Sequence, residues 1–348
     1  MPGAGERAYA YSKACGIIGK SFVGKRLSAL GGVSRLNELD RLIFPLQSKD
    51  LPGRELLSDI ENRIQGRTVK QILAIVGSYA NPPELLVHLL RAYEYSDLKT
   101  CINYLSGGVK TSPAFTNIGR FGTVRFEAFP DLAAMLLETD FAFLLERDDI
   151  KEIAKAAAGA NVDTVNIETE LDFHYYDALI KTLNSLSASD RIFAEKILAE
   201  EISLRNSLWA LRLRTYYGKS PKEAGTALMD IRMKTGTEIL PASDARASLD
   251  LPLDSRAPWK GWRWERFLNP EKPGVQWYAD PRYFQNAASE HLYRLALRFF
   301  HRKPFSISAV FCFIKLKTFE EDLLTSVAEG LGLGLSSGDV FDLLEVQR

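Results

Sequence analysis

The chain has 348 residues, of which 46% are hydrophobic and 25% are charged, so it can form a large core and two or three domains. Its 44 basic residues balance 44 acidic residues, which argues against nucleic acid as the main partner. The three cysteines lie far apart and form no CxxC pair, which excludes a disulfide framework and a zinc knuckle. We expect no metal and no cofactor.

No segment of the sequence is typical of a membrane span. The most lipid-like run, Ser306 to Ile314, is far shorter than the roughly 20 residues that cross a bilayer. The N-terminus lacks a basic-then-apolar export signal. We therefore predict a soluble, cytoplasmic protein.

Residues 16–21, GIIGKS, end like a phosphate-binding loop. The full motif requires a glycine at position 14, where Ala14 stands, and residues 8–13 are not the apolar strand that feeds such a loop. Nucleotide binding through Lys20 and Ser21 is one reading, and a helix interrupted by small residues is the other.

Helical signals dominate the rest of the chain. Between residues 195 and 217, apolar residues recur with a period near 3.6, and Gly218 is suited to the left-handed end of that helix. The run Ser220 to Glu223 carries a serine cap, a proline at the first helical position and a glutamate at the third, which predicts a new helix. Alternation over residues 121–129 is the best strand signal, and no series of such runs follows it.

One short pattern occurs twice. Leu211 to Tyr216 recurs as Ile314 to Phe319, 103 residues later, with the order apolar, basic, apolar, basic, Thr, aromatic. A fainter copy relates residues 97–99 to 203–205. These offsets predict an all-α fold of three repeats of about 105 residues, at 1–115, 116–235 and 236–348. Each repeat is expected to end with helix, glycine, serine cap, helix.

The polar residues define no clear catalytic set. Glu168, Glu170 and Asp172 with His174 could hold a metal, or they could complement the dipole of a helix that begins there. No Ser–His–Asp or Cys–His arrangement stands out.

A proline-rich connection, residues 236–274, contains the segment WKGWRW at 259–264. Trp262 and Trp264 are candidate partner contacts, since aromatic and arginine residues are enriched in protein interfaces and also stack on bases or sugars. The alternative is that these side chains anchor the connection to the helices.

Several motifs resemble one family. Residues 167–176, with acidic residues followed by Leu-Asp and Tyr-Tyr, resemble a signature of the C subunit (eukaryotic d subunit) of V/A-type rotary ATPases. Residues 200–223 resemble its central motif, residues 9–14 its opening segment, and residues 306–344 its third repeat. The resemblance is dense only from about 165 to 225, and residues 108–130 and the tryptophan segment depart from the pattern.

The resemblance implies a funnel of three pseudo-symmetric helical repeats without an active site. Such a subunit is a rotor adaptor for proton or sodium transport, peripheral at the inner face of the membrane and present once per complex. It would join central-stalk subunits to the membrane proteolipid ring. The alternatives are an unrelated helical scaffold and a P-loop nucleotide-binding protein.

Basic residues at matching positions of the repeated pattern could form a collar that docks acidic faces of the stalk or ring. The collar candidates are Arg212, Arg214, Lys315 and Lys317, and Arg205 is a further candidate partner contact. Complementing local helix dipoles is the competing explanation for the two repeated pairs.

Overall fold

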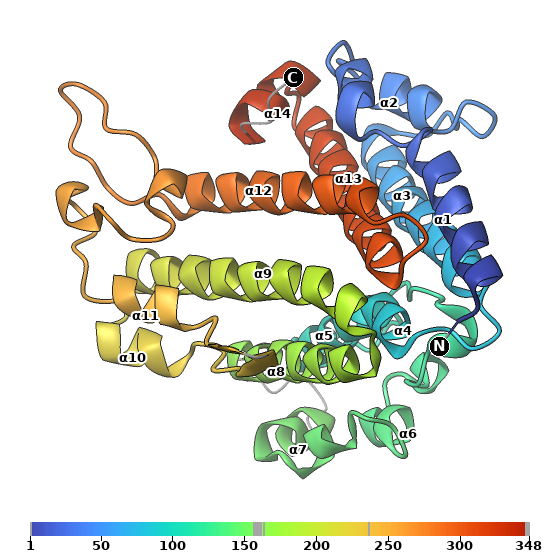
Figure 1. Ribbon diagram of the computed structural model, residues 1–348, viewed down its shortest axis with the longest axis horizontal. Helices are drawn as coiled ribbons and strands as arrows, with labels where there is room; N and C mark the ends of the chain where they lie inside the picture. The colour runs from blue at the N-terminus through green and yellow to red at the C-terminus, as the bar shows by residue number, and fades with distance from the viewer. Residues whose placement is uncertain (1, 156–161, 163, 236, 345–348) are drawn as a thin grey trace. The chain divides into compact units, whose positions relative to one another are not determined.

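A computed structural model describes residues 2–155, 162, 164–235 and 237–344. Their regular structure consists of fourteen α-helices, short 3₁₀ turns and one two-stranded hairpin (Figure 1). The predicted all-helical class is therefore confirmed apart from the hairpin, and residues 121–129 contain parts of two 3₁₀ turns and irregular chain instead of a strand. The three-repeat funnel remains a prediction.

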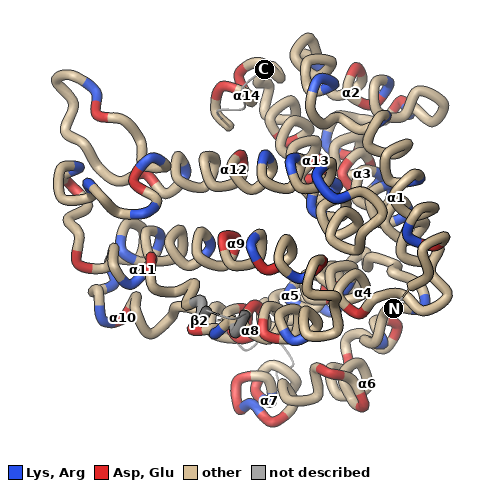
Figure 2. The backbone as a smooth tube through the Cα atoms, viewed as in Figure 1, with Lys and Arg blue, Asp and Glu red and all other residues tan. Residues whose placement is uncertain are grey.

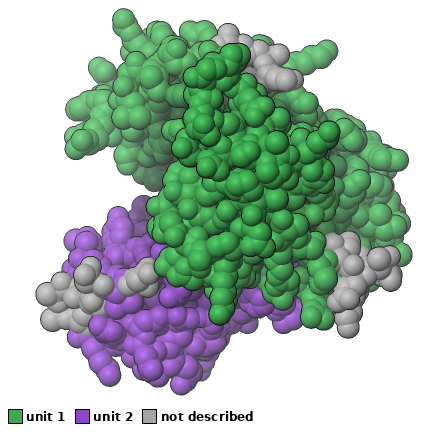
Figure 3. Space-filling model, turned by 90° about the vertical axis from the view of Figure 1, so that its left-hand side faces the viewer, with its two compact units in different colours: residues 1–81, 183–348 green, residues 82–182 purple. Residues whose placement is uncertain are grey.

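The chain divides into two compact units, coloured separately in Figure 3. Unit 1 comprises residues 1–81 and 183–348, and unit 2 comprises residues 82–182. Among the described residues, no helix combines the length and apolar character needed to cross a bilayer.

Unit 1 contains the longer helices. They are α1 (Ala4–Ile18), α2 (Leu36–Ile43), α3 (Gly53–Val76), α9 (Ala188–Thr215), α10 (Pro221–Thr226), α11 (Ser243–Ser248), α12 (Pro281–Arg302), α13 (Ile307–Gly332) and α14 (Ser337–Leu344). Its 3₁₀ turns are η1 (Gly24–Leu30), η5 (Leu183–Ser185), η6 (Ala257–Trp259) and η7 (Glu265–Phe267), and its antiparallel hairpin pairs β1 (Met233–Thr235) with β2 (Thr237–Ile239).

Helix α13 forms the core of unit 1. It packs against α1, α2, α3, α9, α12 and α14. The side chain of Ser306 accepts a hydrogen bond from the Ala309 amide at 3.0 Å, so the helix begins with a serine cap. A helix surrounded on most sides needs an apolar surface wider than one stripe, and the run from Ile307 to Ile314 provides it, being buried throughout.

The ends of α9 and α13 confirm the predicted order of helix, glycine, serine cap and helix. Gly218 and Gly334 adopt left-handed backbone angles, with φ of 60° and 86°. Ser220 then caps α10 in a reciprocal pair with Glu223. Ser336 and Asp339 make the matching exchange before α14.

The first copy departs from this order. Helix α5 (Ala92–Ser106) ends at glycines as predicted, but residues 109–118 contain no helix, so Ser112 caps nothing. The repeated pattern also occupies different places in its two helices. Leu211 lies in the last turns of α9, whereas Ile314 lies near the start of α13, although both are buried.

The glycine-rich run at residues 16–21 follows a helix instead of a strand. Its first three residues complete α1. The Ser21 hydroxyl donates to the Ile17 carbonyl oxygen at 3.0 Å and accepts from Lys317 Nζ at 3.1 Å. The strand–loop–helix context of a phosphate-binding loop is therefore missing, and the helical reading of this segment is correct.

Unit 2 is built on three packed helices, α4 (Glu84–Leu90), α5 and α8 (Val165–Thr182). The other elements are η2 (Gly119–Phe121), η3 (Phe126–Ala128), α6 (Leu132–Leu136), η4 (Ala142–Glu146) and α7 (Asp148–Lys155). Buried carboxylates of α5 fix the connection after it. Asp97 accepts from the Thr116 amide at 2.6 Å, and Glu94 accepts from the Val124 amide at 2.5 Å.

Asp97 gives unit 2 a pH-dependent stability. Burial raises the pKa of Asp97 to about 6, although two hydrogen bonds from Thr116 oppose the shift. Because the folded pKa lies above the unfolded value near 3.9, this group stabilises the fold most below pH 4 and loses that contribution as pH rises through 6. We expect the unfolding free energy of Asp97→Asn to exceed that of the wild type by a difference that grows from pH 4 to pH 7.5 and reaches at most about 3 kcal/mol.

Urea unfolding of both proteins across that pH range, followed by a probe in unit 2, measures this difference. The asparagine can keep both contacts with Thr116 without carrying a charge. A constant difference between the two proteins at all pH values would contradict the assignment.

Candidate partner-binding surface

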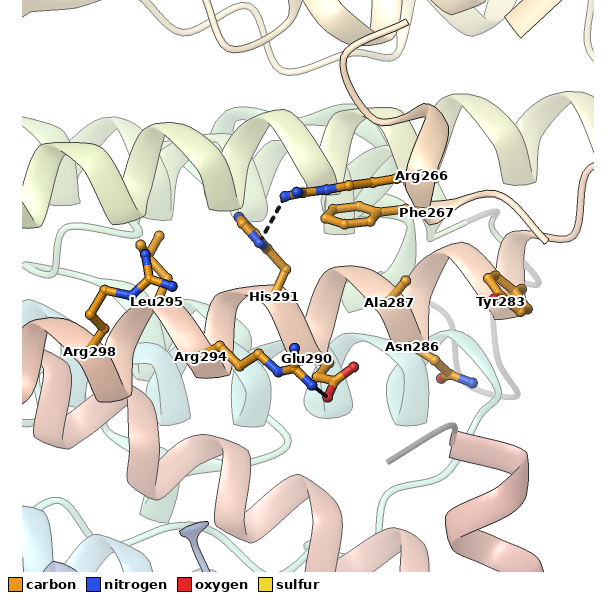
Figure 4. Close-up of a pocket in the computed structure, with 10 residues that line it drawn as sticks. All are labelled: Arg266, Phe267, Tyr283, Asn286, Ala287, Glu290, His291, Arg294, Leu295 and Arg298. Atoms are coloured by element: carbon orange, nitrogen blue, oxygen red, sulfur yellow. Dashed lines mark hydrogen bonds and ion pairs between the residues drawn. The ribbon is translucent and has the colours of Figure 1, made fainter. Parts of the chain in front are cut away.

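Helix α12 carries a basic pocket in unit 1 (Figure 4). Its volume is about 570 Å³, and its lining residues come from α12 and the η7 turn. They are Arg266, Phe267, Tyr283, Asn286, Ala287, Glu290, His291, Arg294, Leu295 and Arg298. Three arginines face one glutamate, so the pocket is electropositive in a chain whose total charge is zero.

A hydrogen-bonded chain positions one wall of this pocket. His291 Nε2 lies 2.6 Å from a carboxylate oxygen of Glu200, and its Nδ1 lies 3.4 Å from the Arg266 guanidinium (Figure 4). Burial would raise the pKa of Glu200, but the bond from His291 and the nearby Arg263 hold that pKa below its ordinary value. An ionised Glu200 accepts from Nε2–H, which leaves Nδ1 as the acceptor for Arg266.

A second hollow, which we call the acidic groove, lies between α3, α12 and α13. Its volume is about 730 Å³. Six carboxylates line it, at Glu61, Glu290, Glu320, Glu321, Asp322 and Glu329, and no lysine or arginine is among its described lining residues. Figure 2 marks the charged residues of both signs along these helices.

Two carboxylates of the acidic groove, Glu61 and Glu329, repel each other. Partial removal of water, together with the neighbouring Glu329, raises the pKa of Glu61. A cationic group placed in the groove would relieve this shift of the Glu61 pKa.

The structure corrects the expectation for the tryptophan segment. Trp262 and Trp264 are 8% and 3% exposed, so neither offers a surface to a partner. They belong to a cluster with Trp259, Trp277 and Phe284 that packs on α9 and α12. The segment is an anchor of the connection, as the alternative reading held.

Each indole of this cluster has a hydrogen-bond acceptor, as buried tryptophans require. Trp264 Nε1–H donates to the Ser203 hydroxyl at 2.9 Å, and Trp262 Nε1–H donates to the Asp244 carbonyl oxygen at 2.7 Å. Trp259 and Trp277 donate to backbone carbonyls of their own connection. These bonds tie the segment to α9 and α11.

The expected collar of four basic side chains is also corrected. Lys317 is 1% exposed and pairs with the buried Glu320, so it cannot contact a partner. Lys315 pairs with Glu201 of α9 at 2.7 Å and is mostly buried. Both lysines lie in the first half of α13, so the helix-dipole explanation does not apply to them.

The arginines at the end of α9 behave differently. Arg214 donates to the carbonyl oxygens of Ser248 and Leu251 at 3.0 and 2.8 Å, which neutralises the C-terminal end of α11. Arg212 donates to Gln285 of α12 at 2.6 Å in an exposed position. Arg205 is exposed on α9. Only Arg205 and Arg212 therefore remain as candidate contacts from the predicted set.

The acidic run of α8 serves ion pairs and hydrogen bonds in unit 2. Glu168 accepts from Asn103, Glu170 pairs with Arg147, Asp172 pairs with Lys99, and His174 Nδ1 lies 2.7 Å from the Tyr95 hydroxyl. Within the described ranges, no group of three or more His, Cys, Asp or Glu side chains could hold a metal ion.

Sequence reasoning missed the basic pocket. Arg294 and Arg298 are one helical turn apart on α12, which is a detectable signal. Arg266 lies in the connection, and only the fold places it over α12. No local pattern could have joined the three arginines.

The comparisons with known proteins concern nearly the whole chain. The profile of the ATP synthase (C/AC39) subunit family matches residues 46–340. The chain belongs to this family. It is also 31% identical over 334 residues to an uncharacterized protein of Treponema pallidum (strain Nichols), covering 94% of this chain and 92% of that protein.

Family membership confirms the resemblance seen in the sequence motifs. The C/AC39 match includes all of unit 2, most of unit 1 and every residue that lines the basic pocket. It also removes the unrelated helical scaffold from the alternatives.

Proposed function

We propose that this C/AC39-family chain is the rotor adaptor of a V/A-type ATPase, which joins the central stalk to the membrane proteolipid ring. The observation that carries the proposal is the family match over residues 46–340. The role needs no catalytic residue in this chain. In this role, one copy of the chain would be present per complex, bound peripherally at the inner face of the membrane.

The charge distribution of unit 1 supports a protein with two different partners. The basic pocket and the acidic groove lie along the same helix, and Asn286 and Glu290 line both. An adaptor between two subunits gains specificity when its two contact surfaces differ in sign, because each surface then repels the wrong partner.

A reconstitution tests this role. Purified chain is mixed with the central-stalk subunits and the proteolipid ring of the same cell's rotary ATPase, in detergent. We expect one stable complex containing all three, and none between stalk and ring without the chain. Stalk and ring that join equally well without the chain would contradict the proposal.

The two remaining sequence candidates are tested in the same assay. Arg205→Glu with Arg212→Glu is expected to weaken assembly more than Arg41→Glu with Arg54→Glu, which changes the charge equally at exposed positions of α2 and α3. The melting temperature of each variant separates lost contacts from lost folding. Equal assembly by both variants would remove Arg205 and Arg212 from the contact surface.

A further inference from the structure

The basic pocket on α12 has unsatisfied positive charge. Arg294 pairs with Glu290 at 2.6 Å, which accounts for the one carboxylate that lines the pocket. Among the described residues, no carboxylate pairs with Arg266 or Arg298. Arg266 is instead held over the pocket by His291 and by its contact with the Phe267 ring, 4.9 Å from its centroid.

The pocket is elongated. Its lining on α12 begins at Tyr283 and ends at Arg298, which is about 22 Å along a helix that rises roughly 1.5 Å per residue. Figure 4 shows Tyr283 and Asn286 at one end and Arg298 at the other. A single phosphate group would reach only part of this length, because hydrogen bonds to an anion span about 3 Å.

The pocket also has apolar side chains in its lining. Tyr283 and Ala287 are half-buried there, whereas Phe267 and Leu295 are each only 6% exposed. A ligand that fills the pocket therefore needs apolar side chains as well as negative charge. Nucleic acid would bring a uniformly charged backbone instead, and this chain has no basic excess to hold it.

We propose that the basic pocket binds an acidic amphipathic helix of a protein partner. Its carboxylates would pair with Arg266 and Arg298, and its apolar face would pack on Tyr283 and Ala287, as helices do in grooves. About 15 residues of helix match the length of the pocket. The inference deepens the proposed function, on which it rests, by giving the chemistry of one partner.

The test uses the full purified chain and a labelled helical peptide of about 15 residues with Glu and Leu on one face. We expect binding by fluorescence anisotropy that weakens as salt rises. Arg266→Glu with Arg298→Glu is expected to lower the affinity at least about tenfold, because attraction becomes repulsion at two positions. Arg282→Glu with Arg302→Glu, on the same helix but outside the pocket, is expected to change it by less than about twofold.

Three results would overturn the inference. They are equal affinity for the pocket variant and the wild type, equal affinity for a peptide with Lys in place of Glu, and displacement of the peptide by equimolar pyrophosphate or oligonucleotide. If the double variant unfolds, Arg298→Gln provides the same test, since Arg298 holds no ion pair with a described residue. Failure of peptide binding alongside normal assembly with stalk and ring would reject this inference and leave the adaptor role standing.

Discussion

Replacing Lys317 by methionine is expected to destabilise unit 1 by about 3–5 kcal/mol. Lys317 and Glu320 are both nearly inaccessible to solvent and pair one turn apart on α13. Glu320 also accepts from the Phe22 amide at 2.7 Å and lies 3.4 Å from Arg67 of α3. Removing the lysine leaves the buried Glu320 carboxylate with these two partners among the residues that the structure describes.

The electrostatics of the pair follow from burial. Burial lowers the pKa of Lys317, although Glu320 opposes the shift. Burial would raise the pKa of Glu320, but Lys317, the Phe22 amide and Arg67 hold it below its ordinary value. Each of these two buried charges therefore stabilises the fold only while the other is present.

Chemical denaturation with two further variants checks this. Lys317→Met with Glu320→Gln is expected to recover most of the loss, because no buried charge is then left without its partner. Lys315→Met is the matched control, two residues away on the same helix, and is expected to cost less, because Lys315 and Glu201 keep some contact with solvent, at 13% and 17% exposed. A loss for Lys317→Met no greater than for Lys315→Met would contradict the buried-pair interpretation.

This prediction also changes how a charge-reversal experiment must be designed. Reversing Arg212, Arg214, Lys315 and Lys317 together would place a glutamate beside the buried Glu320. Such a variant is expected to unfold, so lost assembly would carry no information about docking. Arg205 and Arg212 alone avoid this problem, because neither is buried.

The parts of the fold set by neighbouring residues could be predicted from the sequence. Gly218 and the exchange between Ser220 and Glu223 need only a few consecutive residues to end one helix and begin the next. The class of fold follows from many such signals and from the period of the apolar residues. The β1–β2 hairpin was missed because it is only three residues on each side.

The parts set by distant residues could not be predicted. The repeated pattern at Leu211 and Ile314 suggested equivalent places, yet the caps of the two helices, Ser187 and Ser306, are 119 residues apart and not 103. The pattern alone therefore does not identify structurally equivalent residues. Burial of Lys317 depends on Arg67 and on the chain near Phe22, about 250 and 300 residues away.

The family assignment rested on a different kind of signal. The motifs around residues 167–176 and 200–223 were sufficient to indicate the C/AC39 family, which the profile match then showed. Those motif residues are largely occupied with internal contacts. Tyr175 packs against His88 within unit 2, and Glu200 holds His291 at the basic pocket. Motifs that identify the family therefore do not by themselves mark its contact surface.

The sequence allowed Trp264 to be either a core residue or a partner contact. Substitutions at Trp264 therefore test these two interpretations directly. Its indole stacks on Phe267 with centroids 5.3 Å apart. Trp264→Ala is expected to lose about 3–5 kcal/mol of unfolding free energy, as for other large buried aromatic residues, and Trp264→Phe is expected to lose less because it fills more of the space. Tyr217→Ala, at a side chain that is 58% exposed, is the control and is expected to change stability by about 0.5 kcal/mol or less.

Two measurements on the Trp264 variants together distinguish a core residue from a contact residue. Denaturation gives the stability, and assembly with stalk and ring is measured at a temperature where Trp264→Phe is fully folded. A core residue lowers stability and leaves assembly of the folded protein unchanged, since its side chain contacts only this chain. A contact residue does the reverse, because truncating a side chain at an interface removes binding energy without leaving a cavity in the free protein. Trp264→Ala with wild-type stability and lost assembly would restore the tryptophan segment as a binding surface.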